Sequence, residues 1–189
     1  MEESQSKAKA QEPKHKKSKI YDVYAKSVIT RRVRLPINAI GSGLKSTLEE
    51  KISYEIEGKC INEGYVKPNS CKILTYSSGK VMSDSFIIFE IVVECDICLP
   101  VEGMIIECVA KNITKAGIRA EIKEVSDISS PVIVFVARDH HYSKKHFATI
   151  KESDIINVRV IGQRFELNDK YISVIAELIE PKKPKLVFK

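Results

Sequence analysis

Apolar residues recur every four positions in the first third of the chain, and this spacing predicts one amphipathic helix. Four of them would form a single stripe on its surface: Leu44, Leu48, Ile52 and Ile56. Ser46 and Glu49 have the spacing of a capping box, while Ser42 would cap an earlier start. Gly58 suits the left-handed conformation that ends many helices. We therefore expect a helix that stops at Gly58.

Extended, β-branched segments flank this helix and predict a small antiparallel sheet. The first segment starts near residue 21 and is stopped by Pro36. After a turn region at residues 64–69, strands are expected at residues 71–76 and 86–97, joined by a polar segment. The first half should therefore be an α+β domain in which the helix packs on the sheet.

The second half carries almost only strand patterns. Strands are expected at five places: residues 104–109, 117–122, 131–136, 155–165 and 171–179. Asn168-Asp169 is a turn signal between the last two. Five short strands in this length predict an all-β barrel of the oligonucleotide-binding (OB) type, whose closure removes exposed edges. Leu99-Pro100 marks the domain boundary, because proline cannot donate to a central strand and restricts the residue before it.

Positive charge is concentrated at the two ends of the chain. Residues 1–19 hold six Lys and three Glu, and residues 181–189 hold four Lys and no acid, so the net charge of +6 leaves residues 20–180 at −1. We expect a disordered basic tail, a first domain at 20–99, a barrel domain at 100–180 and a second basic tail. The first tail would be a localisation signal, a nucleic-acid arm or a solubility segment. A nearly neutral body implies that any nucleic-acid contact is local.

Cysteine content and hydropathy bear on the compartment. The five cysteines are an odd number at scattered positions, which favours free thiols over a disulfide framework. No run of about 18 uncharged apolar residues occurs, and residues 1–19 lack an apolar secretory core. We expect an intracellular protein of the nucleus or cytoplasm, or of a virion if a large DNA virus encodes it, with no membrane contact and no secretion.

Three stretches of the second half resemble a known RNA-binding barrel. They are PVEGM at residues 100–104, VAKNITKAGIRAEI at 109–122 and DIINVRVIGQRFELNDKYISVIAEL at 154–178. These stretches are similar to the barrel first described in the largest ribosomal protein of the small subunit, which many translation and RNA-decay proteins share. That resemblance by itself implies only RNA binding.

The first half narrows the resemblance to one family. It contains a strand, then a helix ending in EGKC at residues 57–60, then GYV at 64–66 and two strands that lead into PVEG. This order resembles the stalk subunit of archaeal and eukaryotic RNA polymerases, the seventh-subunit family of polymerase II. The resemblance implies a non-catalytic subunit whose tip domain docks on the polymerase core beside the clamp, next to a small helical stalk partner. Its barrel would contact single-stranded nascent RNA.

Two sets of residues follow from this resemblance. Gly58, Gly64 and Tyr65 would contact the polymerase core, although turn chemistry alone also accounts for the two glycines. The second barrel strand of such proteins usually begins Gly-x-Phe with an exposed ring, whereas this chain has Arg119 at the ring position. Strand alternation points Ile118 inward and Arg119 outward, so a guanidinium contact would replace base stacking.

A basic loop is the main candidate for RNA contact. Its members offer cations for phosphates, imidazoles and one ring for a base: Arg138, His140, His141, Tyr142, Lys144, Lys145 and His146. Lys115, Arg119 and Arg159 are weaker candidates outside this loop. An ordinary solvated loop would have the same composition. The histidines lack a carboxylate or cysteine at ligand spacing, so we expect no metal site.

The remaining motifs favour structural interpretations. Cys95 and Cys98 have the spacing of half a zinc ribbon, with Cys60 and Cys71 as a conceivable other half, but an odd separation along a strand points them to opposite faces. We interpret them as small apolar strand residues. The glycine-rich segment at residues 41–47 lacks the glycines of a phosphate-binding loop.

The sequence therefore indicates a non-enzymatic RNA polymerase subunit without a cofactor. Its partners would be the polymerase core subunits and single-stranded RNA. Two alternatives stay open: a free translation or RNA-decay factor that uses the same barrel, and an interaction module without affinity for RNA.

Overall fold

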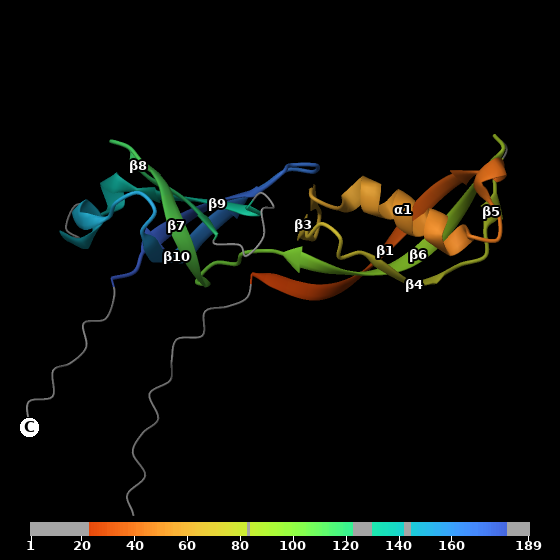
Figure 1. Cartoon of the computed structure of the whole chain (residues 1–189), viewed down its shortest axis with the longest axis horizontal. Coiled ribbons are helices and arrows are strands. Elements are labelled where there is room, and N and C mark those ends of the chain that lie inside the picture. The colour runs from red at the N-terminus through yellow and green to blue at the C-terminus, as the bar shows by residue number, and fades with distance from the viewer. Residues whose placement is uncertain (1–22, 83, 123–129, 142–144, 181–189) are drawn as a thin grey trace, which may run out of the picture.

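The computed structural model describes residues 23–82, 84–122, 130–141 and 145–180. These residues form a six-stranded sheet with a helix, followed by a closed five-stranded barrel. The two halves lie end to end along the long axis of the molecule (Figure 1). No helix among the described residues is both long enough and apolar enough to cross a membrane.

The first half is a sheet organised around one long strand. Its strands are β1 (Tyr24–Pro36), β2 (Cys60–Ile61), β3 (Gly64–Val66), β4 (Lys72–Tyr76), β5 (Lys80–Val81) and β6 (Phe86–Cys98). β1 pairs antiparallel with β6 along its whole length, while β3, β4 and β5 also pair with β6. The long strands at residues 24–36 and 86–98 confirm the extended patterns, since β-branched residues fit the pleated surface that they form.

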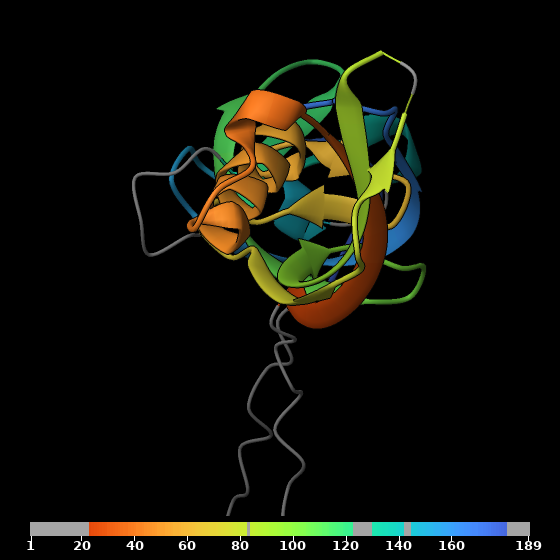
Figure 2. The ribbon, with the colours of Figure 1, turned by 90° about the vertical axis from the view of Figure 1, so that its right-hand side faces the viewer.

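Helix α1 (Leu44–Ile56) lies against one face of this sheet (Figure 2). Leu48, Ile52 and Ile56 of the predicted stripe are buried between the helix and the sheet. Leu44 is partly buried and packs against the same cluster. The helix itself is thus confirmed. Gly58 follows it with φ +69°, the left-handed geometry expected of a helix end, and donates its N–H to the carbonyl of Val66 at 3.0 Å.

The caps predicted for the N-terminus of α1 are wrong. The N-cap is Gly43, which has no side chain to donate or accept, and neither Ser42 nor Ser46 replaces it. Ser46 lies inside the first turn of the helix instead. The carboxylate of Glu49, expected to complete a capping box, accepts the N–H of Ile73 in β4 at 3.2 Å. Glu49 therefore links the helix to the sheet.

The turn predicted at residues 64–69 is also wrong in its first half, because β3 lies there. Gly64 has φ +131°, and a Cβ atom at this position would lie 2.5 Å from the carbonyl oxygen of Cys98. The glycine therefore permits close strand pairing with β6, whereas the sequence suggested a turn. β2 and β3 are only two and three residues long, too short for an alternating pattern.

The second half is a closed barrel, as predicted. Its strands are β7 (Ile105–Ile113), β8 (Gly117–Ile122), β9 (Val132–Ala137), β10 (Ile155–Arg164) and β11 (Ile172–Leu178). They close in the order β10-β11-β9-β8-β7, with β9 and β11 parallel and the other pairs antiparallel. Two short 3-10 helices lie between β9 and β10, at Arg138–His140 and Lys145–Thr149. Ile118 is buried and Arg119 is not, which confirms the predicted alternation of β8.

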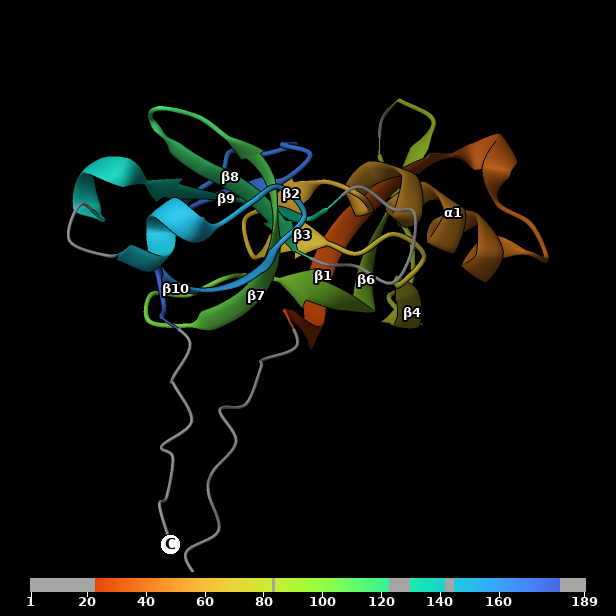
Figure 3. The ribbon, with the colours of Figure 1, turned by 60° about the vertical axis from the view of Figure 1, so that its left-hand side comes forward.

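Apolar packing continues across the junction between the halves. Cys60, Tyr65 and Cys98 belong to strands of the first half, yet their side chains are buried in the cluster that forms the barrel core. The β10–β11 connection reaches back to the same place. There Cys60 donates its N–H to the carbonyl of Asp169 at 2.7 Å, and Asn168 donates its N–H to the carbonyl of Cys60 at 2.8 Å. Figures 1 and 3 show this hairpin ending beside β3.

These contacts make the junction a part of the core. Leu99 and Pro100 lie between β6 and β7, and Pro100 is buried. With Tyr65 shared by both halves and two backbone hydrogen bonds beside it, rotation about Leu99-Pro100 would break buried contacts. The described residues therefore form one body in which the sheet sets the direction of the barrel.

Candidate nucleic-acid interface

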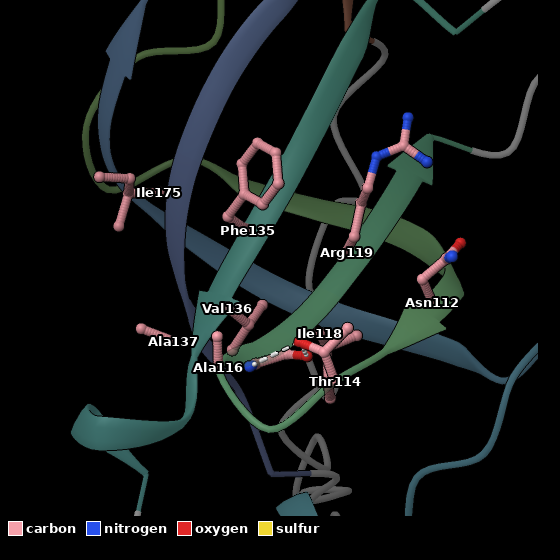
Figure 4. Close-up of a pocket in the computed structure, with 10 residues that line it drawn as sticks. Asn112, Thr114, Ala116, Ile118, Arg119, Phe135, Val136, Ala137 and Ile175 are labelled. Atoms are coloured by element: carbon pink, nitrogen blue, oxygen red, sulfur yellow. Dashed lines mark hydrogen bonds between the residues drawn. The ribbon is translucent and has the colours of Figure 1, made fainter.

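One face of the barrel carries an outward row of side chains across four strands. Asn112 of β7 lies opposite Arg119 of β8. Arg119 lies opposite Phe135 of β9, which in turn lies opposite Ile175 of β11. The neighbours of Arg119, Phe135 and Ile175 along their strands are buried in the barrel core: Ile118, Ala120, Val134, Val136, Val174 and Ala176. Strand alternation therefore directs the row outward, and Figure 4 shows Phe135 standing between Ile175 and Arg119.

Phe135 and Ile175 give this row an apolar centre. They are 44% and 56% exposed, and they border a hollow of about 470 Å³ that also includes Thr114 and Ala116. An exposed aromatic ring on a barrel strand offers a stacking surface for a base, with a free energy of roughly 1–3 kcal/mol per base. The sequence reasoning missed Phe135. No polar alternation marks it, because every residue of β9 is apolar, and the register with Arg119 and Ile175 is what places it outward.

Gly117 shapes one edge of the hollow. A Cβ atom there would lie 2.2 Å from the carbonyl oxygen of Val136, so only glycine lets β8 approach β9 this closely. The turn before it is held by a hydrogen bond from the N–H of Thr114 to the carbonyl of Gly117, at 2.9 Å. The rim next to Phe135 is therefore a fixed backbone structure.

Arg119 supplies a cation beside the ring. Its guanidinium lies 3.0 Å from the carboxylate of Glu121, two residues along the same outward face. The pair is only partly shielded from water, with 38% of the Arg119 side chain exposed, and such pairs contribute little to stability. A phosphate can therefore compete with Glu121 for the guanidinium at small cost, and the planar group also suits bidentate phosphate binding.

Two members of the predicted basic loop have structural partners. Arg138 donates to the carbonyls of Thr114 and Lys115, each at 2.9 Å, and its guanidinium lies 5.1 Å from the centre of the Phe147 ring. It thereby ties the end of β9 to the β7–β8 turn. The hydrogen bonds of Arg138 to Thr114 and Lys115 fix the turn at the rim of the hollow. Contact of Arg138 with RNA stays a prediction.

His141 is buried, with 2% of its surface exposed. Its Nε2 accepts the N–H of Leu178 at 2.9 Å, which leaves the proton on Nδ1, and Nδ1 donates to the carbonyl of Ala137 at 2.6 Å. The ring also stacks on Phe147 at 5.4 Å. His141 therefore joins the ends of β9 and β11, and the expectation that it is a surface RNA ligand is wrong.

The remaining candidates, in the loop and at Lys115, are exposed, half-buried or outside the described residues. Lys115, at the tip of the β7–β8 turn, and His140, directly after β9, are both exposed. His146 is half-buried, and its Nδ1 lies 3.4 Å from the hydroxyl of Thr149. Tyr142 and Lys144 lie outside the described residues, as does the side chain of Lys145 at the start of the second 3-10 helix.

Arg159 is exposed on β10, which pairs with β11 and therefore borders the Ile175 end of the row. Its neighbours in the sheet are Ile105 on β7 and Glu177 on β11. Because β11 lies between β9 and β10 in the barrel, Arg159 and Phe135 are on strands that do not touch. Arg119 therefore lines the hollow, Lys115 lies in the turn between two residues that line it, and Arg159 lies on the far side of β11 from Phe135.

The predicted polymerase-contact residues lie at the junction of the halves. Gly58 is half-buried, Gly64 is buried, and Tyr65 is 1% exposed within the barrel core cluster. The ring of Tyr65 is therefore committed to packing inside this chain. Contact of these positions with a polymerase core stays a prediction, for which Gly58 has the most accessible surface.

The cysteines are free thiols in the structure, as expected. Cys95 packs in the core of the first half and Cys98 in the cluster of the barrel, which agrees with their interpretation as small apolar strand residues. Within the described ranges, no three His, Cys, Asp or Glu side chains come together in a way that would hold a metal ion.

Comparison with known proteins gives one informative similarity. No protein-family model matches the chain. The chain is 28% identical over 162 residues to a protein of Acanthamoeba polyphaga mimivirus that is provisionally named as a DNA-directed RNA polymerase subunit. The aligned region covers 77% of this chain and 76% of the mimivirus protein. Neither the sheet nor the barrel alone makes up that share of the chain, so the similarity includes parts of both halves.

Proposed function

We propose that this chain is a non-catalytic subunit of a multisubunit DNA-directed RNA polymerase, specifically the stalk subunit whose barrel contacts nascent single-stranded RNA. The similarity to the mimivirus protein supports membership in a polymerase, because it extends over both halves. The order of a helix-covered sheet followed by a barrel supports the stalk assignment. The barrel order, with β9 and β11 as its parallel pair, supports the OB type.

The observation that carries the RNA contact is the outward row centred on Phe135. Related barrels present a ring from their second strand, whereas here the second strand presents Arg119 and the third presents Phe135 directly opposite. In this chain the ring on which a base would stack is therefore on the third barrel strand and not on the second, and it lies beside the guanidinium of Arg119. An aromatic ring and a cation on one barrel face suit bases and phosphates of any sequence, so binding should be largely independent of sequence and sensitive to salt.

In this proposal the first half docks on the polymerase core, next to a small helical stalk partner, and the region of Gly58 contributes to that surface. The shared packing of Tyr65 and the bonds between Cys60 and the β10–β11 connection matter for the mechanism. They transmit the position of the docked sheet to the barrel. The barrel would then hold its outward row at a fixed distance and direction from the site where RNA leaves the enzyme.

Titration of labelled single-stranded RNA against the purified chain tests the RNA contact. Phe135→Ala should weaken binding by about 5- to 150-fold, which corresponds to the loss of one stacked base. Ile155→Ala is the matched control, since Ile155 is also an exposed apolar residue of the barrel, at 54%, but lies on β10. It should leave the Kd unchanged within about twofold.

Two results would count against the proposal. Equal binding by Phe135→Ala and the wild type would remove the row from the RNA site. Recovery of ribosomes or degradation enzymes, in place of polymerase subunits, with the tagged chain from its native cell would favour a translation or RNA-decay factor that uses the same barrel.

A further inference from the structure

Two cysteines face each other across neighbouring strands of the first half. Lys72 of β4 pairs with Glu94 of β6, and the backbone N–H of Asp96 donates to the side chain of Ser70 at 3.3 Å. Cys71 and Cys95 are the residues between these two contacts, so the antiparallel register places them opposite each other. Directly opposed residues in such pairs have Cα atoms about 4.5–5.5 Å apart, inside the range that a disulfide spans.

Burial and side-chain contacts agree with this register. Cys95 and Ile73 both point to the helix-covered face of the sheet, and Cys71, two residues before Ile73, shares that face. The thiol of Cys71 hydrogen-bonds to the sulfur of Cys95. Cys95 is buried, while Cys71 is partly buried at the edge of the core. Of the two residues, Cys71 is therefore the one less shielded from solvent.

The electrostatic surroundings separate this pair from other cysteines of the chain. The hydrogen bond from Cys71 and the nearby Arg31 guanidinium lower the pKa of Cys95, whereas donating that hydrogen bond raises the pKa of Cys71. By contrast, burial raises the pKa of Cys60 to about 11 and that of Cys108 to about 12. Burial is the main cause of these two shifts, whereas a neighbouring thiol is the main cause of the shifts at Cys71 and Cys95.

We propose that Cys71 and Cys95 are a modification site at which hydrogen peroxide forms a reversible intramolecular disulfide. Cys71, the less buried residue of the pair, passes its proton to the thiolate of Cys95, and its sulfur then attacks one oxygen of the peroxide. The O–O bond breaks, the departing hydroxide takes a proton from solvent and leaves as water, and Cys71 becomes a sulfenic acid. The sulfur of Cys95 then attacks the Cys71 sulfur, releases its proton, and expels the second water. One peroxide is reduced and two thiols are oxidised, so atoms and electrons balance.

The bond would join the start of β4 to the middle of the sheet. It would close the chain between residues 71 and 95, which contains β4, β5 and most of β6. Constraining a loop of this length in the unfolded state should raise the melting temperature by on the order of 10 °C. Glu57 also fixes the backbone next to Cys71, because its carboxylate accepts the N–H groups of Asn69 and Cys71, each at 2.9 Å.

The test treats the full chain with graded hydrogen peroxide, blocks remaining thiols with a maleimide, and maps the products by peptide mass spectrometry. The expected product is a peptide pair linked through Cys71 and Cys95, with the melting temperature raised and both changes reversed by dithiothreitol. Cys71→Ser should abolish the link, and Cys108→Ser should leave it intact.

Three outcomes would overturn the proposal, and none depends on a variant that fails to fold. The first is full maleimide labelling of Cys71 and Cys95 in the wild-type chain after peroxide treatment. The second is a disulfide between either residue and a different cysteine. The third is oxidation of Cys71 to sulfinic acid with no link to Cys95. The site is independent of RNA binding, since it lies in the sheet and not in the barrel.

Discussion

Replacing Tyr65 with alanine should destabilise the chain far more than its place on a three-residue strand suggests. The residue lies on β3 of the first half, yet its ring is 1% exposed and packs with the barrel core. Removing a buried aromatic ring costs about 3–5 kcal/mol, from the lost burial and from the cavity that remains. Total stabilities of single domains are about 5–15 kcal/mol. The change therefore removes a large fraction of the stability of the folded chain.

Equilibrium unfolding in urea, followed by circular dichroism, measures this loss. Tyr54→Ala is the matched control, because it removes the same ring from α1 at a position that is 79% exposed. It should change the free energy of unfolding by no more than about 0.5 kcal/mol. A loss below about 1 kcal/mol for Tyr65→Ala would refute the reasoning, since the ring would then not couple the two halves.

Three further substitutions have defined outcomes. Gly64→Ala should lower the unfolding free energy by more than about 1 kcal/mol in the same urea titration, because its Cβ would meet the carbonyl of Cys98 at 2.5 Å and its φ is positive. His141→Ala should cost about 2–4 kcal/mol by that measure, since two backbone groups lose their buried hydrogen-bond partner; an unchanged midpoint would contradict it. Arg119→Gln should reduce the slope of log K against log salt for RNA by about 0.7, and an unchanged slope would show that this side chain stays paired with Glu121.

The elements that the sequence predicted have strong periodic signals. The stripe of α1 repeats over more than three turns, and the barrel strands are six to ten residues long, so local pattern and tertiary burial agree. β2, β3 and β5 were missed because segments of two or three residues carry no periodicity. The helix cap was missed because Gly43 contributes only backbone, whereas serines nearby had the expected spacing.

The candidate site was predicted in part, for physical reasons that differ between residues. Alternation along β8 was enough to place Arg119 outward. Phe135 was missed because β9 is apolar at every position, which hides its outward face. His141 was assigned to the surface because its decisive partner, Leu178, is 37 residues away in the sequence. Composition shows that a loop is basic, but long-range contacts decide which of its side chains are free to bind.

Crosslinking of nascent RNA in a transcribing complex tests the central claim most directly. Native cells that express the tagged chain would be supplied with 4-thiouridine during transcription and irradiated. The tagged chain would then be recovered, and its RNA crosslinks would be mapped by mass spectrometry. We expect large polymerase subunits to be recovered with it, and RNA crosslinks on the β8 and β9 peptides that contain Arg119 and Phe135. Recovery without polymerase subunits, or crosslinks confined to the sheet of the first half, would contradict the account.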